Sequence, residues 1–277
     1  MSAHFVVVPA WQGSGSSRAM RLIDGADAIR GDLPAASTTV VEVPAGAGDA
    51  LGTGVHRYSS IAQIADSLVA ALEALPATDA LPITVGGDCG VEFAAIRHAL
   101  SRHPGTVVVW FDAHPDLNTP ESSPSGAFHG MVVRTLLGGG PAELAPAPLL
   151  EPGRLVLAGT RSLDDAEADH VAEAGIVLLP PARLATPEAL VAAVRATGAT
   201  SVYLHVDLDV LDPAEITGVA FPEPFGVRVA ELTEAIRAVR AEFEVVGAGI
   251  TEFAPADPSA AVDDLPAILR IVSALVR

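Results

Sequence analysis

Short apolar runs recur along the whole chain, separated by stretches with a helical pattern, and this alternation limits the fold more than any other feature. Most of the runs are apolar throughout, as expected for parallel strands that helices cover on both faces. The expected strands comprise residues 5–8, 39–43, 83–85, 106–111, 155–157, 176–179, 201–206 and 244–250.

Between these runs, apolar residues recur three or four positions apart, which is the spacing of an amphipathic helix. One such pattern contains Ile61, Ile64, Leu68, Leu72 and Leu75, and others cover residues 91–101, 164–174, 187–196, 229–241 and 260–276. Alternation of strands and helices predicts a doubly wound, mostly parallel α/β sheet with helices on both faces.

No linker interrupts this pattern, so we expect a single domain over residues 1–277. The Gly- and Pro-rich stretches at 46–54 and 138–152 are interpreted as surface loops, because strands or helices resume directly after them. Half of the residues are hydrophobic and only 18% are charged, which excludes an intrinsically disordered chain.

The charge balance argues against nucleic acid and anionic membranes as partners, because 34 acids outnumber 16 bases and leave a net charge of -18. The same balance favours cationic small molecules and metal ions. The single cysteine, Cys89, rules out an intrachain disulfide and fits a reducing cytoplasm. No signal peptide is recognisable at residues 1–8, and no apolar run reaches the roughly 20 residues that span a bilayer. A cytoplasmic protein is expected.

Polar residues gather at the ends of four expected strands, where sheets of this type bind their ligands. The clusters are residues 86–89, residues 112–116 with His129 downstream, residues 205–209 and residues 251–252. In an extended segment alternate side chains point the same way, so Asp112, His114 and Asp116 are expected to converge. Asp207 and Asp209 share that spacing.

Four carboxylates and an imidazole at one sheet edge repel one another strongly unless a cation lies between them. A donor set rich in oxygen with a single nitrogen suits Mn²⁺ or Mg²⁺ better than a tetrahedral Zn²⁺ site. The alternative is a set of ordinary strand-end acids that are solvated or cap helices. Two such groups, each closing a buried strand, favour the metal site.

The order of four motifs resembles that of the ureohydrolase superfamily, which contains the arginases and agmatinases. The motifs are Gly-Gly-Asp-Cys (86–89), Asp-Ala-His-Pro-Asp-Leu-Asn-Thr-Pro (112–120) with His129-Gly130, Val-Asp-Leu-Asp-Val-Leu-Asp-Pro (206–213) and Thr-Glu-Phe-Ala-Pro (251–255). The resemblance implies a three-layer α/β/α sandwich with an eight-stranded sheet. It also implies a binuclear manganese cluster that activates a bridging hydroxide against a guanidinium carbon.

By position, the family's metal ligands correspond to Asp112, His114, Asp116, Asp207, Asp209 and, at the sixth position where the family usually has His, Cys89. His129 matches the histidine assigned to proton transfer, and Glu252 matches the acid that pairs with the substrate guanidinium. Because a guanidinium is a poor electrophile, its hydrolysis needs the strong nucleophile that a metal provides by lowering the pKa of water from about 16 towards 7.

The segment after the first metal motif resembles the arginase version, in which Asn and Ser hold the substrate α-carboxylate. Asn118 and Ser125 match those residues, and Asp164 matches the acid that contacts the α-amino group. This favours an amino-acid substrate over agmatine, which lacks the carboxylate. The alternative for these three residues is turn or N-cap chemistry.

Three residues depart from the family pattern. Phe221 stands where the family has a pocket threonine, so the identity of the substrate's guanidino head group stays open. His205, two residues before Asp207, is either a residue that supports the metal ligands or a packed core histidine. At Cys89, sulfur matches Mn²⁺ poorly, so either the thiolate binds a weakened second metal or the thiol binds none. Similar substitutions accompany amidinohydrolases of modified arginines such as Nω-hydroxy-L-arginine.

We therefore expect a manganese-dependent amidinohydrolase that acts on the guanidino group of arginine or a modified arginine. The alternatives are another ureohydrolase, of the agmatinase, guanidinobutyrase or formimidoylglutamase type, and a non-enzymatic relative with a weakened metal site. Members of the family are often trimers or hexamers, so the resemblance also implies a homo-oligomer.

Overall fold

Eight strands form one sheet in the computed structural model, which describes residues 2–76, 80–145 and 149–277. Their spatial order is β2-β1-β3-β8-β7-β4-β5-β6, and each pairing in this part of the chain is parallel. The strands are β1 (Ala3–Val8), β2 (Thr38–Val40), β3 (Leu81–Gly86), β4 (Val107–Phe111), β5 (Leu155–Ala158), β6 (Val177–Leu179), β7 (Ser201–Asp207) and β8 (Glu244–Thr251).

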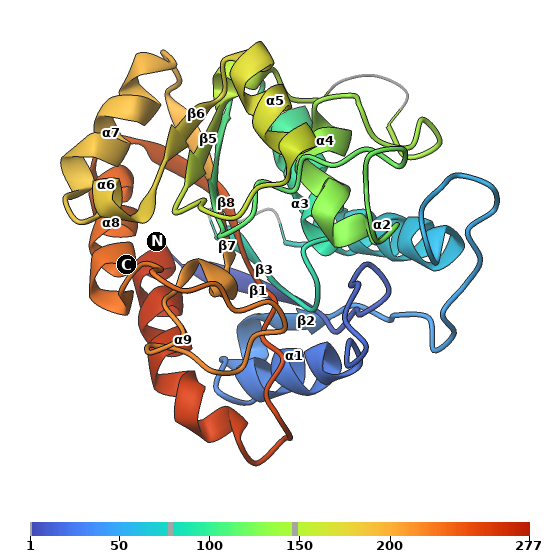
Figure 1. Ribbon diagram of the computed structural model, residues 1–277. Helices are drawn as coiled ribbons and strands as arrows, with labels where there is room; N and C mark the ends of the chain where they lie inside the picture. Colours follow the sequence, from blue (N-terminus) through green and yellow to red (C-terminus); the bar gives the residue numbers. More distant parts are fainter. Residues whose placement is uncertain (1, 77–79, 146–148) are drawn as a thin grey trace.

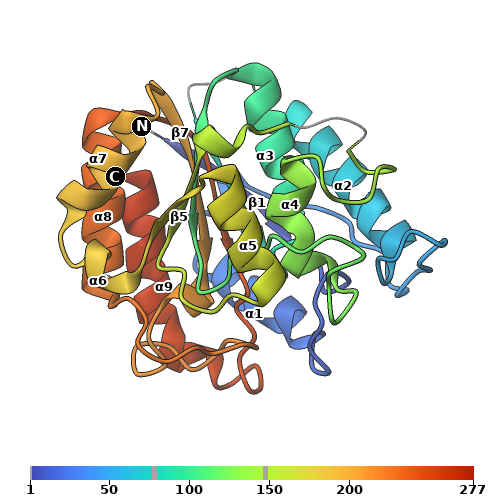
Figure 2. The ribbon, with the colours of Figure 1, turned by 45° about the horizontal axis from the view of Figure 1, so that its top comes forward.

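Helices cover both faces of this sheet (Figures 1 and 2). One layer contains α1 (Arg21–Gly31), α6 (Pro181–Leu184), α7 (Pro187–Ala196), α8 (Val229–Glu242) and α9 (Ala261–Val276). The other contains α2 (Tyr58–Glu73), α3 (Val91–Arg102), α4 (Val132–Leu136) and α5 (Asp165–Ala174). Among the described residues, no helix is both long and apolar enough to cross a membrane. The predicted α/β sandwich is confirmed.

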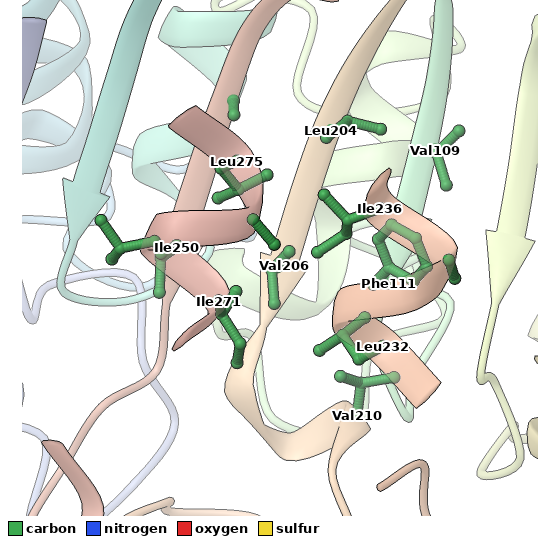
Figure 3. Close-up of a cluster of buried hydrophobic side chains, with 14 of the residues drawn as sticks. Val109, Phe111, Leu204, Val206, Val210, Leu232, Ile236, Ile250, Ile271 and Leu275 are labelled. Carbon is green, nitrogen blue, oxygen red and sulfur yellow. The ribbon is translucent and has the colours of Figure 1, made fainter. Parts of the chain in front are cut away.

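Alternate residues of the central strands build two separate cores, one under each helical layer. Val109 and Phe111 of β4 pack on the side of α8 and α9, where Ile236 and Ile271 are fully buried (Figure 3). Trp110, between them in sequence, packs on the opposite side with α3 and α4. Each fully buried side chain of this size stabilises the fold by about 1.5–3 kcal/mol, so both layers hold the strand ends in place.

The elements that the sequence pattern missed have local explanations. α1 contains Gly25, which weakens a helical pattern, but a Cβ there would lie 1.8 Å from the carbonyl oxygen of Phe253. The helix therefore needs this glycine to pack closely. The short helices α4 and α6, of 5 and 4 residues, are too brief to show a period.

Two elements end earlier than predicted, and most other predicted boundaries shift by one or two residues. β2 ends at Val40 and not at 43, because the chain leaves the sheet ahead of Pro44 after one last bond from Val41 N to Val7 O. α2 ends at Glu73, so Leu75 lies beyond it. Of the predicted loop at 138–152, residues 146–148 lie outside the described part of the chain.

Candidate metal centre

Four neighbouring strands, β3, β8, β7 and β4, end at one edge and carry the predicted site residues there. Cys89 lies in the turn after β3, Glu252 directly follows β8, Asp207 closes β7 and Asp112 directly follows β4. Their order in the sheet, rather than their order in the sequence, makes them neighbours. All four are buried, with 1–3% of their surface exposed.

One part of this edge, which we name the His114 half, consists of Asp112, His114 and Asp209. His114 Nδ1 lies 3.1 Å from Asp209 Oδ2 and 3.4 Å from Asp112 Oδ1. Asp112 Oδ2 accepts a 2.9 Å hydrogen bond from Trp110 Nε1, and Asp209 Oδ1 accepts one of 3.1 Å from Ala113 N. One ligand atom from each of the three lies within 4.8 Å of the others, close enough to hold a single ion.

The other part, the Cys89 half, consists of Cys89, Asp207 and Glu252. Cys89 Sγ donates to Asp207 Oδ2 at 3.1 Å and lies 3.1 Å from Thr251 Oγ1, while Cys89 N donates to Glu252 Oε1 at 3.2 Å. Asp207 Oδ1 accepts from Asp209 N at 2.7 Å, which ties the two halves together. These three residues also meet the 4.8 Å condition for a single ion.

Asp116 and Glu252 each hold a buried carboxylate oxygen, Oδ2 and Oε2 respectively, that has no hydrogen-bond partner among the described residues. Both residues also have left-handed backbone, with φ of 52° and 65°. Such backbone costs on the order of 1–3 kcal/mol in a residue other than glycine, and it concentrates at functional sites. Each of these two residues combines a buried oxygen that has no hydrogen-bond partner among the described residues with a strained backbone. This combination indicates that the two oxygens bind a ligand.

Burial and mutual repulsion dominate the electrostatics of the edge. Burial, followed by the charge of Asp209, raises the pKa of Asp112 to about 7. Burial, followed by the charges of neighbouring aspartates, raises the pKa values of Asp116 and Asp207 well above the usual range. Although burial lowers the pKa of His114, its bonds to Asp112 and Asp209 raise it overall.

The donor set fits a divalent cation. In the part of the chain that the structure describes, the ion pairs of these aspartates involve His114 alone, and arginine side chains pair elsewhere on the surface. A bound cation would offset the repulsion among these carboxylates, which contributes to the raised pKa values of Asp112, Asp116 and Asp207. The structure thus brings the six predicted metal-ligating residues to one edge, and their role as ligands stays a prediction.

His129 and Glu252 form a pair beside the Cys89 half. His129 Nδ1 lies 3.4 Å from Glu252 Oε1, and His129 Nε2 accepts a 3.3 Å bond from Gly15 N. Burial lowers the pKa of His129, but the bond to Glu252 and the charges of Glu252 and Asp88 raise it overall. The ring centroid of Phe221 lies 5.2 Å from that of His129. Phe221, which stands where the family has a pocket threonine, is therefore next to the His129–Glu252 pair.

The three predicted substrate-binding residues are only partly brought together. Asn118 Nδ2 donates to Asp164 Oδ2 at 2.8 Å, which joins two of them. Asp164 is also the N-cap of α5 and forms a capping box with Glu167, so the N-cap alternative is realised as well. Ser125 is exposed, and its Oγ accepts a local hydrogen bond from Ala127 N.

Sequence reasoning missed several residues that support the site. Glu223 Oε1 lies 3.8 Å from His114 Nε2, and Arg161 donates to the carbonyl oxygens of Asp209 and Glu223. Glu167 accepts from Leu117 N, which fixes the loop after β4; its spacing of three from Asp164 was the available signal. Glu92, an acid on an apolar helix face, is fully buried beneath the edge.

Comparison with known proteins agrees with this geometry. The chain matches the arginase family over residues 15–269. N(omega)-hydroxy-L-arginine amidinohydrolase from Streptomyces lavendulae is 32% identical over 218 residues, which cover 77% of each chain. An arginase from Staphylococcus aureus (strain MRSA252) is 32% identical over 174 residues, which cover 60% of this chain and 57% of that protein, less than two thirds of its length.

Solved structures show the same fold. The arginase of Entamoeba histolytica in complex with L-ornithine superposes with a TM-score of 0.86 at 21% identity, covering 99% of this chain and 97% of that one. The formimidoylglutamase of Bacillus subtilis gives 0.75 at 20% identity, covering 99% and 87%. The family match over most of the sequence, together with the shared fold, leads to one conclusion: the chain belongs to the arginase family and is a hydrolase of amidine C–N bonds.

Proposed function

We propose that this protein is a manganese-dependent amidinohydrolase of arginine or a modified arginine such as Nω-hydroxy-L-arginine, releasing ornithine and urea or hydroxyurea. The observation that carries this proposal is the convergence of acidic residues and His114 at one sheet edge beside the His129–Glu252 pair. Asp112, Asp209 and His114 form one candidate ion site, Asp207 belongs to the other, and the charges of Asp112 and Asp209 act on Asp116 beside them. The similarity to the N(omega)-hydroxy-L-arginine amidinohydrolase supports the choice of substrate.

Two Mn²⁺ ions would be held by Asp112, His114, Asp116, Asp207 and Asp209, with Cys89 at the sixth position. Oxygen-rich donors with one imidazole match Mn²⁺ in hardness, whereas the sulfur of Cys89 does not. When bound, these ions would supply a nucleophile at neutral pH by lowering the pKa of water.

Glu252 and His129 provide the remaining groups. Glu252 Oε2 is buried and has no hydrogen-bond partner in the part of the chain that the structure describes, so it is free to accept a hydrogen bond from a guanidinium N–H. Glu252 Oε1 accepts from Cys89 N and lies beside His129. His129 has a raised pKa, so it is suited to hold a proton near neutral pH and to give it to the leaving amine of the substrate.

At the amino-acid end, Asn118 and Ser125 would bind the substrate α-carboxylate, and Asp164 would bind the α-amino group. The bond between Asn118 and Asp164 supports this arrangement, because it places a donor and an acidic acceptor side by side. An amine and a carboxylate on one carbon need that combination, whereas agmatine offers no carboxylate.

The experiment that tests the proposal compares kcat/KM for arginine, Nω-hydroxy-L-arginine, agmatine and formiminoglutamate on manganese-loaded protein. We expect the two arginines to be hydrolysed, with Nω-hydroxy-L-arginine preferred. A preference for plain arginine would contradict the assignment of Nω-hydroxy-L-arginine as the substrate. Release of formamide would identify a formimidoylglutamase. A protein that binds manganese but turns over none of the four would contradict the proposed function.

The remaining proposals concern the number of domains, the oligomeric state and the location of the protein in the cell. We propose a single domain over residues 1–277, a homo-oligomer of three or six chains and a cytoplasmic location. The mass in solution, measured by light scattering, tests the oligomer.

A further inference from the structure

A second polar cluster lies directly beneath the Cys89 half, inside the sheet. It consists of Glu92 on α3 and of Tyr203 and His205 on β7, which are 0–2% exposed. Because alternate residues of a strand share one face, Tyr203 and His205 lie on the same face of β7 as Asp207. We name these three residues the Glu92 cluster.

The contacts of the Glu92 cluster lead towards the metal centre. Tyr203 OH donates to Glu92 Oε2 at 3.0 Å, and His205 Nδ1 lies 3.3 Å from the same oxygen. The other ring nitrogen, His205 Nε2, lies 3.6 Å from Cys89 Sγ. The imidazole therefore stands between a buried carboxylate on one side and the candidate ligand Cys89 on the other.

The orientation of the imidazole is held by Trp110, the neighbour of His205 across the β4–β7 pairing. The two rings stack with centroids 3.5 Å apart and an interplanar angle of 21°. Trp110 Nε1 also donates to Asp112 Oδ2, so one side chain positions both the histidine and a candidate metal ligand.

The sheet makes room for this cluster with two glycines of β8. A Cβ on Gly249, which pairs with His205, would lie 2.1 Å from Glu92 Oε1, and a Cβ on Gly247 would lie 2.6 Å from the ring of Tyr203. Burying an acid and an imidazole in a sheet interior costs free energy that apolar side chains would not, so stability alone does not explain the cluster.

The arrangement matches the usual surroundings of a metal-binding histidine. Such a histidine turns one ring nitrogen to a carboxylate, which orients the ring and leaves the lone pair of the other nitrogen for the metal. Here Glu92 is the carboxylate beside Nδ1, at 3.3 Å but without a hydrogen bond to it among the described residues, and Nε2 faces the edge. One ligand atom each from Cys89, Asp112 and His205 lies within 4.8 Å of the others.

We propose that His205 is a metal ligand, supplying from β7 the imidazole nitrogen that position 89 lacks. The inference rests on the proposed manganese centre. Nitrogen is a better ligand for Mn²⁺ than sulfur, so an imidazole behind Cys89 compensates for the poor match of the thiol. Glu92 is then a positioning residue that acts through His205, and Tyr203 holds the Glu92 carboxylate.

The test is a titration of metal-depleted full-length protein with Mn²⁺, counting bound metal per chain. His205→Asn should weaken the weaker of the two manganese sites by about 100-fold or more, and Glu92→Gln by about 10- to 100-fold. Cys89→Ser should change it only a few-fold. The control, His98→Asn, removes a half-buried imidazole on the same helix as Glu92 and should leave both sites unchanged.

A rescue separates ligation from folding. Adding Cys89→His to His205→Asn returns an imidazole to the same half and should restore the second manganese; failure to restore it would show that the single variant merely damages the core, and would overturn the proposal. Pulsed EPR of manganese-loaded wild type with ¹⁵N-labelled histidine needs no variant. Two coordinated histidine nitrogens are expected, from His114 and His205, and one alone would overturn the proposal.

The outcomes for the two proposals differ. Wild-type protein that binds no Mn²⁺, or that turns over fully with a chelator present, contradicts the proposed function. Wild type that binds two manganese ions, with His205→Asn binding them equally well, contradicts only the role of His205.

Discussion

The two halves of the metal centre lie at the same sheet edge but differ in what surrounds them. In the His114 half, oxygen and nitrogen atoms face one another, and His114 is 28% exposed. In the Cys89 half, Cys89, Asp207 and Glu252 are buried, and one donor is sulfur backed by the Glu92 cluster. Because the donor sets differ in hardness, we expect the His114 half to bind Mn²⁺ more tightly.

The largest effect is expected from removing a carboxylate of the tighter half. Asp209→Asn deletes a charge that faces His114, and a metal supplies several kcal/mol of transition-state stabilisation. Since each 1.36 kcal/mol is tenfold in rate, kcat should fall by about 10³-fold or more. Steady-state release of urea or hydroxyurea measures this, with Asp66→Asn on the exposed face of α2 as the control. Near-normal kcat with two manganese ions bound would refute the role of this half.

His129→Asn, beside the Cys89 half, should lower kcat by about 10²- to 10⁴-fold, the usual contribution of a general acid or base. Because His129 pairs with Glu252 and is not a proposed ligand, the manganese content should stay unchanged. A loss of manganese along with activity would mean that His129 belongs to the metal site instead.

Removing the metal should make stability depend on pH. Burial raises the folded-state pKa of Asp112 to about 7, above the value near 4 of an unfolded aspartate. A raised carboxyl pKa favours the folded state at low pH, so this stability is fully present below about pH 4 and is lost as the pH rises through 7. Thermal unfolding of chelated protein should show a Tm that falls between pH 4 and 7, and Mn²⁺ should reverse the fall at pH 7. An equal fall with manganese bound would point to general charge repulsion.

The smallest effect is expected from the partner of His114. Glu223 lies 3.8 Å from His114 Nε2, and groups that orient a metal-binding histidine contribute about 10- to 100-fold in metal affinity. Glu223→Gln should therefore weaken the tighter manganese site by about tenfold while leaving the weaker one unchanged. Glu234→Gln on the exposed side of α8 is the control. If Glu223→Gln lowers the manganese affinity of the weaker site instead, Glu223 supports the Cys89 half and not the His114 half.

The sequence predicts the position of a site residue where that position depends only on residues nearby in the chain. Asp112 and Asp207 could be placed at strand ends because the apolar runs before them predict parallel strands, and such strands share one edge. The Glu92 cluster could not be found in this way, because its contacts depend on which strands are neighbours and on their register, as in the pairing of His205 with Trp110 and Gly249. Glu223 had no local signal, since a long loop brings it to His114.

The asymmetry of the two halves is tested most directly by counting manganese per chain in wild type and Cys89→His during a Mn²⁺ titration, with urea or hydroxyurea release measured on the same samples. The account predicts one tight and one weak site in wild type, two tight sites in the variant, and product release that requires bound manganese in both. Two equal sites in wild type that Cys89→His leaves unchanged, or product release without manganese, would contradict it.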